Sequence, residues 1–176
     1  LYKIMDEHGV ERRSLKESSQ IRFSNVPISY KVKSALSLAE EKLKIAGCML
    51  YWAEGSRYRP ENKTYNVEFT NSDPEMVKVF LDFLRRICGV DEKKLRAYLY
   101  YYDGQNVEEL KKFWSRATKI PETQFTKPYF RENTPNIHNK LARGVMHLRY
   151  SDVRLLKQIY GWIEEYQQSI NLGRFV

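Results

Sequence analysis

The apolar residues of this chain recur with two different spacings, and these spacings alternate along the sequence. Residues 65–70 (YNVEFT) place apolar side chains on one side and polar ones on the other, which is the period-two pattern of a half-buried strand. Residues 71–74 (NSDP) then provide a helix cap and a first-turn proline, and the apolar residues that follow have helical spacing up to Gly89. Strands that alternate with helices predict a single compact α+β domain.

Six further elements follow from the same spacings. We expect a long helix at residues 32–54 that Gly55 ends, a strand at 94–102, a helix at 106–118, strands at 125–131 and 144–150, and a helix at 152–168. In the strands, the residues predicted to face the core are Leu95, Ala97, Leu99, Met146 and Leu148. The residues predicted to face away are Arg96, Tyr98, Tyr100, Tyr102, Val145, His147 and Arg149.

The break at residues 24–27 (SNVP) divides the chain, because Pro27 biases the residue before it away from helix. We predict a helix-turn-helix segment and linker at residues 1–27 and the main domain at 28–176. Gly9 suits the turn, and residues 11–20 form the second helix, which would present Arg12, Arg13, Ser14 and Lys16 to DNA. The alternative interpretation is a solvated amphipathic hairpin with no DNA contact.

The charge of the chain favours a polyanionic partner. Its 176 residues carry a formal net charge of +8, which attracts nucleic acid at low salt, although a basic protein with no such partner is the alternative. The two cysteines each lie in an apolar stretch without metal-ligand spacing, which favours a reduced, cytoplasmic setting. No apolar run reaches membrane-spanning length, so we expect no membrane association.

The end of the long predicted helix carries a motif, residues 47–55 (GCMLYWAEG). Leu50 and the terminal Ala53-Glu54-Gly55 resemble a degenerate LAGLIDADG motif of the homing endonucleases, whose first acidic position is Trp52 here and whose internal glycine is Met49. The order of elements across residues 34–168 also resembles that family, with the helix at 106–118 as an insertion. The resemblance implies a mixed or antiparallel sheet with helices packed on one face.

Three short stretches are similar to small prokaryotic proteins that couple a helix-turn-helix to such a domain: Phe113-Trp114, residues 118–121 (TKIP) and residues 161–163 (GWI). We expect the tryptophans of these stretches, Trp114 and Trp162, to be core residues. His8, His138 and His147 are scattered along the chain, which argues against a catalytic or metal-binding trio of histidines.

Glu54 is the candidate catalytic residue. A carboxylate in the last helical turn faces the negative end of the helix dipole, which disfavours it by about 0.3–1 kcal/mol unless a cation lies nearby. A two-fold axis between paired faces formed by Gly47, Leu50 and Ala53 would bring two Glu54 carboxylates together in a homodimer. Mg²⁺ held by Glu54 and Gly55 would balance that charge, and the resemblance implies the same role. The alternative is that Glu54-Gly55 merely ends the helix.

The outward strand faces provide the main candidate DNA contacts. Arg96, Tyr98, Tyr100, His147 and Arg149 would form a basic, aromatic surface able to enter the major groove of double-stranded DNA. The alternative is that the tyrosines pack beneath the inserted helix.

Three functional hypotheses follow from these observations. The first is a dimeric, sequence-specific DNA-binding protein that resembles a LAGLIDADG endonuclease, with Mg²⁺-dependent phosphodiester hydrolysis as its reaction. The second is a non-catalytic helix-turn-helix transcriptional regulator that uses the same domain. The third is a protein-interaction module whose basic face meets an acidic partner.

Overall fold

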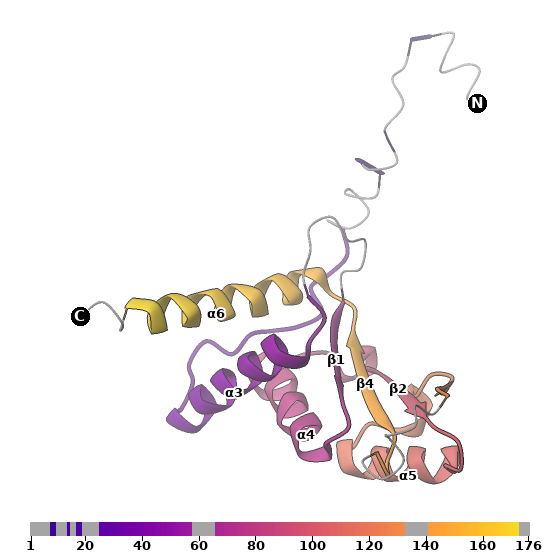
Figure 1. Cartoon of the computed structure of the whole chain (residues 1–176). Helices are drawn as coiled ribbons and strands as arrows, with labels where there is room; N and C mark the ends of the chain where they lie inside the picture. The colour runs from indigo at the N-terminus through magenta and orange to yellow at the C-terminus, as the bar shows by residue number, and fades with distance from the viewer. Residues whose placement is uncertain are drawn as a thin grey trace.

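The computed structural model describes residues 8, 9, 14, 17 and 18, together with 25–57, 66–132 and 141–172. These residues form an α+β fold with four α-helices and a four-stranded mixed sheet (Figure 1). The elements in chain order are α3 (Leu38–Glu54), β1 (Val67–Asn71), α4 (Pro74–Asp82), a π-helical turn η1 (Phe83–Ile87), a 3-10 turn η2 (Glu92–Lys94), β2 (Arg96–Tyr101), α5 (Val107–Thr118), a 3-10 turn η3 (Glu122–Gln124), β3 (Tyr129–Phe130), β4 (Val145–Tyr150) and α6 (Val153–Leu172). None of the helices in these residues is long and apolar enough to cross a bilayer.

The strands lie in the order β1-β4-β2-β3. β4 pairs antiparallel with both of its neighbours, whereas β3 runs parallel to β2. The register places Arg149 between Glu68 of β1 and Arg96 of β2, and residues opposite each other in a register point to the same side of a sheet. Burial of Ala97, Leu99, Met146 and Leu148 confirms the predicted inward face of β2 and β4. Tyr102, predicted to face outward, instead follows the end of β2 and is buried.

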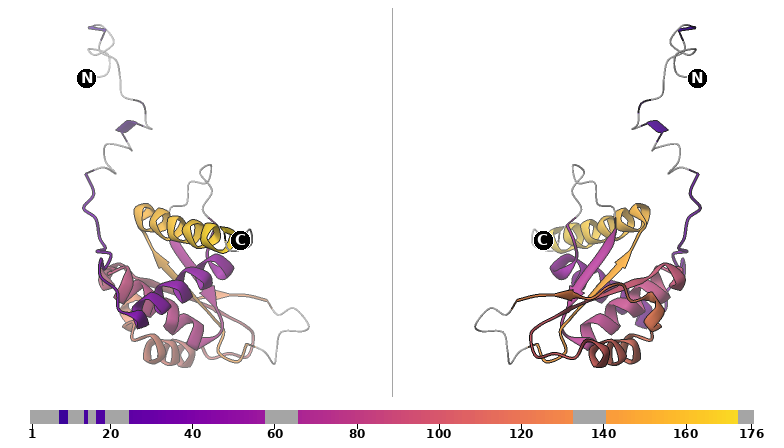
Figure 2. Two further views of the ribbon diagram at one scale, coloured as in Figure 1. Left: turned by 90° about the vertical axis from the view of Figure 1, so that its left-hand side faces the viewer. Right: turned by 90° about the vertical axis from the view of Figure 1, so that its right-hand side faces the viewer.

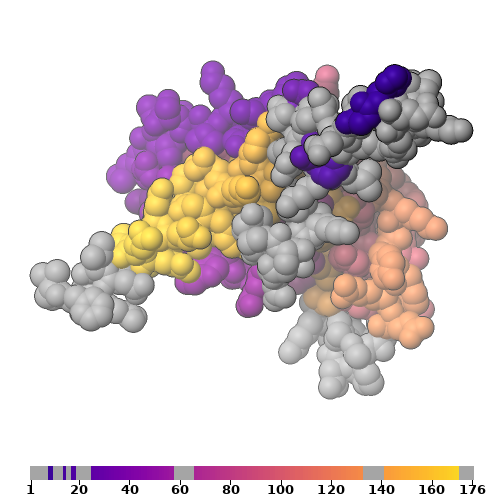
Figure 3. All heavy atoms as spheres, turned by 90° about the horizontal axis from the view of Figure 1, so that it is seen from above, coloured from indigo at the N-terminus to yellow at the C-terminus, as the bar shows by residue number. Residues whose placement is uncertain are grey.

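The helices cover one face of this sheet (Figures 1 and 2). Val67, Phe69, Ala97, Leu99 and Leu148 are almost completely buried in a core that α3, α4, α5 and α6 complete on that face. Figure 3 looks down on α6 and shows it lying along α3. Trp114 and Trp162 belong to this core, as predicted. The opposite face has no helix from the described residues upon it.

The long helix begins later than predicted. The expected start was residue 32, but α3 begins at Leu38, because Ser37 caps it and forms a reciprocal capping box with Glu40. The preceding residues are extended instead, since the amide of Lys31 donates to the carbonyl of Gly89 at 3.0 Å and that of Lys33 to Ile87 at 2.9 Å. A remote stretch of chain thus takes the backbone hydrogen bonds that a longer helix would have used.

The predicted linker is also joined to the domain. The guanidinium of Arg154 on α6 donates to the carbonyls of Val26 and Pro27 at 3.0 and 3.1 Å. The Tyr150 hydroxyl donates to the carbonyl of Ser29. The chain is therefore tied to the main body from about residue 26 onward.

The strand predicted at residues 125–131 is mostly absent. Only Tyr129–Phe130 forms β3, and Phe125 makes a single isolated bridge to Ala97. Pro128 has no backbone N–H, so it cannot continue a ladder between these two points. From residue 25 onward, the other predicted strands and helices are present with shifts of a few residues at their ends, whereas most of the helix-turn-helix predicted at residues 1–27 lies outside the described residues.

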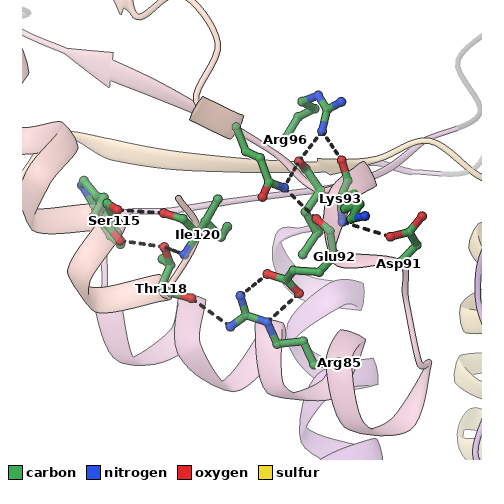
Figure 4. Close-up of polar contacts among 11 residues, drawn as sticks. Arg85, Asp91, Glu92, Lys93, Arg96, Ser115, Thr118 and Ile120 are labelled. Atoms are coloured by element: carbon green, nitrogen blue, oxygen red, sulfur yellow. Dashed lines mark hydrogen bonds and ion pairs between the residues drawn. The ribbon is translucent and has the colours of Figure 1, made fainter. Parts of the chain in front are cut away.

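Helix α5 has a local cap at its start and a tie to the helical layer at its end. Asn106 caps its start by accepting from the amides of Glu108 and Glu109. At its other end, the Arg85 guanidinium donates to the carbonyl of Thr118 at 2.8 Å while its Nε pairs with Glu92 at 3.0 Å (Figure 4). α5 therefore belongs to the layer that contains α4 and does not extend over the open face of the sheet.

Candidate nucleic-acid interface

The C-terminal end of α3 meets the outer edge of the sheet at β1. Glu54 is exposed, and Gly55 forms an isolated antiparallel bridge with Phe69. The amide of Ser56 donates to the carbonyl of Glu68 at 3.0 Å. A Cβ on Gly55 would lie 2.5 Å from the carbonyl oxygen of Tyr51, so this close approach requires glycine whether or not Gly55 binds a metal.

Gly47 does not lie on the helix surface where the dimer seam was predicted. A Cβ on Gly47 would lie 2.1 Å from Cγ of Phe83 in the same chain, so Gly47 faces the core of its own domain. Leu50 is half-buried and Ala53 is exposed. Of the three residues predicted for the seam, only Ala53 lies fully on the surface.

A different side of α3 exposes apolar residues. Leu38, Ile45 and Trp52 are 75%, 45% and 53% exposed, and they recur at intervals of seven residues. Residues seven apart lie on the same side of a helix, and this spacing is the sequence signal that could have identified them. We call these three residues the α3 stripe.

The described residues hold no group of three or more His, Cys, Asp or Glu side chains that could bind a metal ion. Glu54 thus supplies one carboxylate per chain. Mg²⁺ commonly uses one or two carboxylates and completes its octahedron with water and phosphate oxygens. The residues fit a shared Mg²⁺ only where a second chain brings its own Glu54.

Five of the predicted DNA contacts lie together on the open face of the sheet. Arg96, Tyr98 and Tyr100 are on β2, and His147 and Arg149 are on the neighbouring β4. The register pairs Tyr98 with His147 and Arg96 with Arg149. Because α5 packs on the other face, the alternative in which these tyrosines lie beneath the inserted helix does not hold.

Arg149 is held in place at the centre of this face. Its Nε donates to Glu68 at 2.6 Å and its Nη1 to the Tyr98 hydroxyl at 2.9 Å, and its Cζ lies 4.8 Å from the centre of the Tyr98 ring. Glu68 was not among the predicted site residues, although its outward position in a period-two strand is a visible signal. Arg96 donates instead to the carbonyls of Lys93 and Leu95.

Of the five predicted contacts on the open face, His147 is the one that is buried, with 8% of its surface exposed. Its Nδ1 lies 2.7 Å from Oγ1 of Thr70, and its ring meets those of Tyr98 and Tyr100 edge to face. Its Nε2 is buried and has no hydrogen-bond partner among the described residues. Burial lowers the pKa of His147, an effect that Glu68 opposes and Arg149 reinforces, so the neutral ring is favoured at neutral pH.

A hollow of about 630 Å³ opens on this face beside β3. Its lining, which we call the β3 hollow, comprises Tyr98, Tyr100, Tyr101, Lys127, Pro128, Tyr129, Phe130, His147 and Arg149. Sequence reasoning assigned no role to Lys127, Tyr129 or Phe130, because only the parallel pairing of β3 with β2 brings them here.

The open face has an excess of positive charge. Four cationic side chains lie on this face or at its β3 edge: Arg96, Lys127, Arg131 and Arg149. The carboxylate of Glu68 faces them from β1. Arg131 stacks over the ring of Tyr100 at 4.4 Å. Tyrosine, arginine and histidine side chains supply donors, acceptors and flat rings on one surface, which is a combination suited to nucleic acid.

Arg12, Arg13 and Lys16 of the predicted helix-turn-helix lie outside the described residues. Ser14 is described, and its Oγ accepts from the amide of Glu17 at 3.1 Å while its own amide donates to the Glu17 carboxylate at 2.7 Å. This reciprocal pair is a capping box, which begins a helical turn. The Ser14 hydroxyl is thus engaged in local structure.

Comparisons of the chain with known protein families, with curated proteins and with solved structures find no match. The class that the structure defines is therefore a structural one: an α+β domain with a helical layer on one face of a mixed sheet and a basic, aromatic surface on the other.

Proposed function

We propose that this protein binds double-stranded DNA through the open face of its sheet, as a homodimer of LAGLIDADG-like domains. The observation that carries the proposal is the gathering of Arg96, Tyr98, Tyr100, His147 and Arg149 on a sheet face without a helical cover. A face of this kind offers guanidinium groups to guanine edges and to phosphates, and hydroxyl groups to phosphates.

The α3 stripe supports the dimer. Soluble monomers seldom expose a line of large apolar side chains at seven-residue spacing, whereas paired helices bury such a line against each other. Because α3 ends at the β1 edge, a two-fold axis beside this helix would set the two open faces next to each other. The dimer would then present one continuous basic surface to a two-fold symmetric DNA site.

Glu54 lies nine residues, or two and a half helical turns, after Ile45, which puts it on the side of α3 opposite the α3 stripe. A shared Glu54 site therefore needs the two-fold axis to pass by the C-terminal ends of the two α3 helices. Mg²⁺ bound there would activate water and stabilise charge on the phosphate during hydrolysis. Glu54 would hold the ion and the sheet would hold the DNA. The second candidate is a regulator that binds DNA without cleaving it, and the position of Glu54 on the side of α3 opposite the α3 stripe favours it.

Binding is tested by the fluorescence anisotropy of a labelled duplex library at 50 and 200 mM salt. We expect binding that weakens steeply with salt, and we expect Arg96→Ala to weaken it and to reduce the salt slope by about one unit, as for the loss of one phosphate contact. Lys112→Ala is the matched control, since Lys112 is an exposed cation on α5, on the helical side. Equal effects of both variants, or no binding by the wild type, would leave the interaction module as the explanation.

Catalysis and assembly need separate measurements. A nicking assay with Mg²⁺ should show cleavage that Glu54→Gln abolishes without loss of binding, and retention of DNA without cleavage by the wild type would favour the regulator. Sedimentation should show that the wild type is a dimer. The double variant Ile45→Ser/Trp52→Ser should be a monomer. A wild type that remains monomeric on DNA would contradict the shared Glu54 site.

A further inference from the structure

We infer that the β3 hollow binds a single unpaired nucleobase of DNA, stacked on Tyr129 and hydrogen-bonded to Nε2 of His147. This inference rests on the proposed DNA binding and goes beyond it, because a fully paired duplex does not present a base in this form. The hollow combines a buried nitrogen without a partner among the described residues, an exposed aromatic ring and nearby cations.

The nitrogen is Nε2 of His147, a side chain more than nine-tenths buried that lines the hollow. Its other nitrogen is already committed to Thr70 at 2.7 Å. If the Thr70 hydroxyl donates to Nδ1, Nε2 carries the proton and is a donor; if Nδ1–H donates, Nε2 is an acceptor. A buried polar atom without a partner is unfavourable, and the edge of a base offers both donors and acceptors to relieve it.

The platform is Tyr129, which is 65% exposed at the sheet edge. It lies opposite Tyr100 in the β2–β3 register and meets that ring edge to face, with centres 5.9 Å apart. Arginines already cover a face of the Tyr98 and Tyr100 rings, at 4.8 and 4.4 Å. Among the tyrosines of the hollow, Tyr129 is thus the one that exposes most of its surface for stacking.

The cations suit the phosphates of the same nucleotide. Lys127 lines the hollow and Arg131 follows β3 directly, and neither forms an ion pair with a described residue. A volume of about 630 Å³ is in the range of sites that enclose small organic ligands, so a base with its sugar can be accommodated.

An unpaired base fits this arrangement better than a paired one. In a duplex both faces of a base are covered by its neighbours and its pairing edge is occupied, so it cannot lie on an aromatic ring and meet a buried donor at once. Sheets that bind single strands stack unpaired bases on exposed aromatic side chains and neutralise the backbone with nearby cations. Enzymes that extrude a base from a duplex also receive it in an aromatic pocket.

The test compares three DNAs by fluorescence anisotropy: a 20-nucleotide thymidine strand, a fully paired 20-base-pair duplex, and the same duplex with one unpaired thymine. We expect Tyr129→Leu to raise Kd for the strand and for the duplex with the unpaired thymine by about 5- to 100-fold, as for the loss of one stacked base. The Kd for the paired duplex should change less than twofold. Phe113→Leu is the control, because it makes the same kind of change at an aromatic side chain on α5, on the helical side of the sheet.

A second readout follows His147 directly. Addition of the thymidine strand should shift the ¹⁵N resonance of Nε2 and leave that of Nδ1 nearly unchanged. The inference would be overturned if the Nε2 resonance did not move, or if Tyr129→Leu weakened binding to all three DNAs equally or to none of them. The proposed DNA binding would remain in either case. Failure of the wild type to bind any of the three DNAs would overturn the inference and the proposed function together.

Discussion

Replacing Gly47 with alanine should destabilise the domain, although alanine is the better helix former. Gly47 lies in the middle of α3, where alanine alone would add about 1 kcal/mol of stability. The added Cβ would lie 2.1 Å from Cγ, 2.5 Å from Cβ and 2.6 Å from Cδ2 of Phe83. Carbon atoms pack at about 3.5–4.0 Å, so α3 and η1 would have to separate by more than 1 Å, as a rough measure.

The surroundings of Phe83 leave little room for that movement. Its ring is fully buried, with Phe80 at 5.9 Å and Trp162 at 6.1 Å between ring centres. Overpacking of a core costs about 1–3 kcal/mol and occasionally more, and a contact this short belongs at the upper end or above it. After the helical gain is subtracted, we expect a net loss of at least about 2 kcal/mol, which lowers Tm by about 4–8 °C in a chain of this size.

Thermal unfolding followed by circular dichroism measures this effect, and Gly161→Ala is the matched control. Gly161 lies inside α6 with nothing within 4 Å of a built Cβ, so alanine there should raise Tm by a few degrees. A Gly47→Ala variant as stable as Gly161→Ala would refute the packing of Gly47 on Phe83. A change in sedimentation without a loss of stability would instead restore Gly47 to a seam between two copies.

Three further outcomes test the fold and the open face. Arg85→Ala removes the ties to Glu92 and to the Thr118 carbonyl, and it should lower the free energy of unfolding in urea by about 1–2 kcal/mol with an unchanged m value. Tyr150→Phe removes the hydroxyl that contacts Ser29 and the Asp91 amide, so it should cost about 1–2 kcal/mol and speed hydrogen exchange of the Lys31 amide, as measured by NMR. Burial lowers the pKa of His147, so the folded state resists protonation of this ring. The wild type should therefore lose stability relative to His147→Phe as pH falls below about 6.5, which Tm values measured from pH 7.5 to 5 would show. Equal Tm changes in the two proteins would mean that the ring is solvated.

Local chemistry was enough to predict most elements of the described fold. Asp73 with Pro74 and Asn106 cap α4 and α5 as their residue types indicate, and alternating side chains gave the faces of β2 and β4. These features depend on neighbours in sequence, which a single chain displays. The outward cluster of arginine and tyrosine on β2 and β4 was predictable for the same reason.

Features that depend on remote contacts were not predictable. The late start of α3 follows from hydrogen bonds to residues 87–89, and the buried face of Gly47 is decided by Phe83 thirty-six positions away. His147 was expected on the surface, yet the two flanking tyrosines and Thr70 enclose it. The β3 hollow exists because a two-residue parallel pairing returns the chain to β2. The spacing of residues along a sequence does not reveal contacts between segments that are far apart in the chain.

The borders of the sheet bear on how this protein behaves at high concentration. An unpaired strand margin is a template on which foreign strands can add, and long, flat margins promote fibre growth. Here β3 is only two residues long and follows Pro128, while the outer side of β1 is met by Gly55 and Ser56. Within the described residues, neither border has a long row of free backbone amides and carbonyls. We therefore expect little addition of strands from other molecules to the sheet.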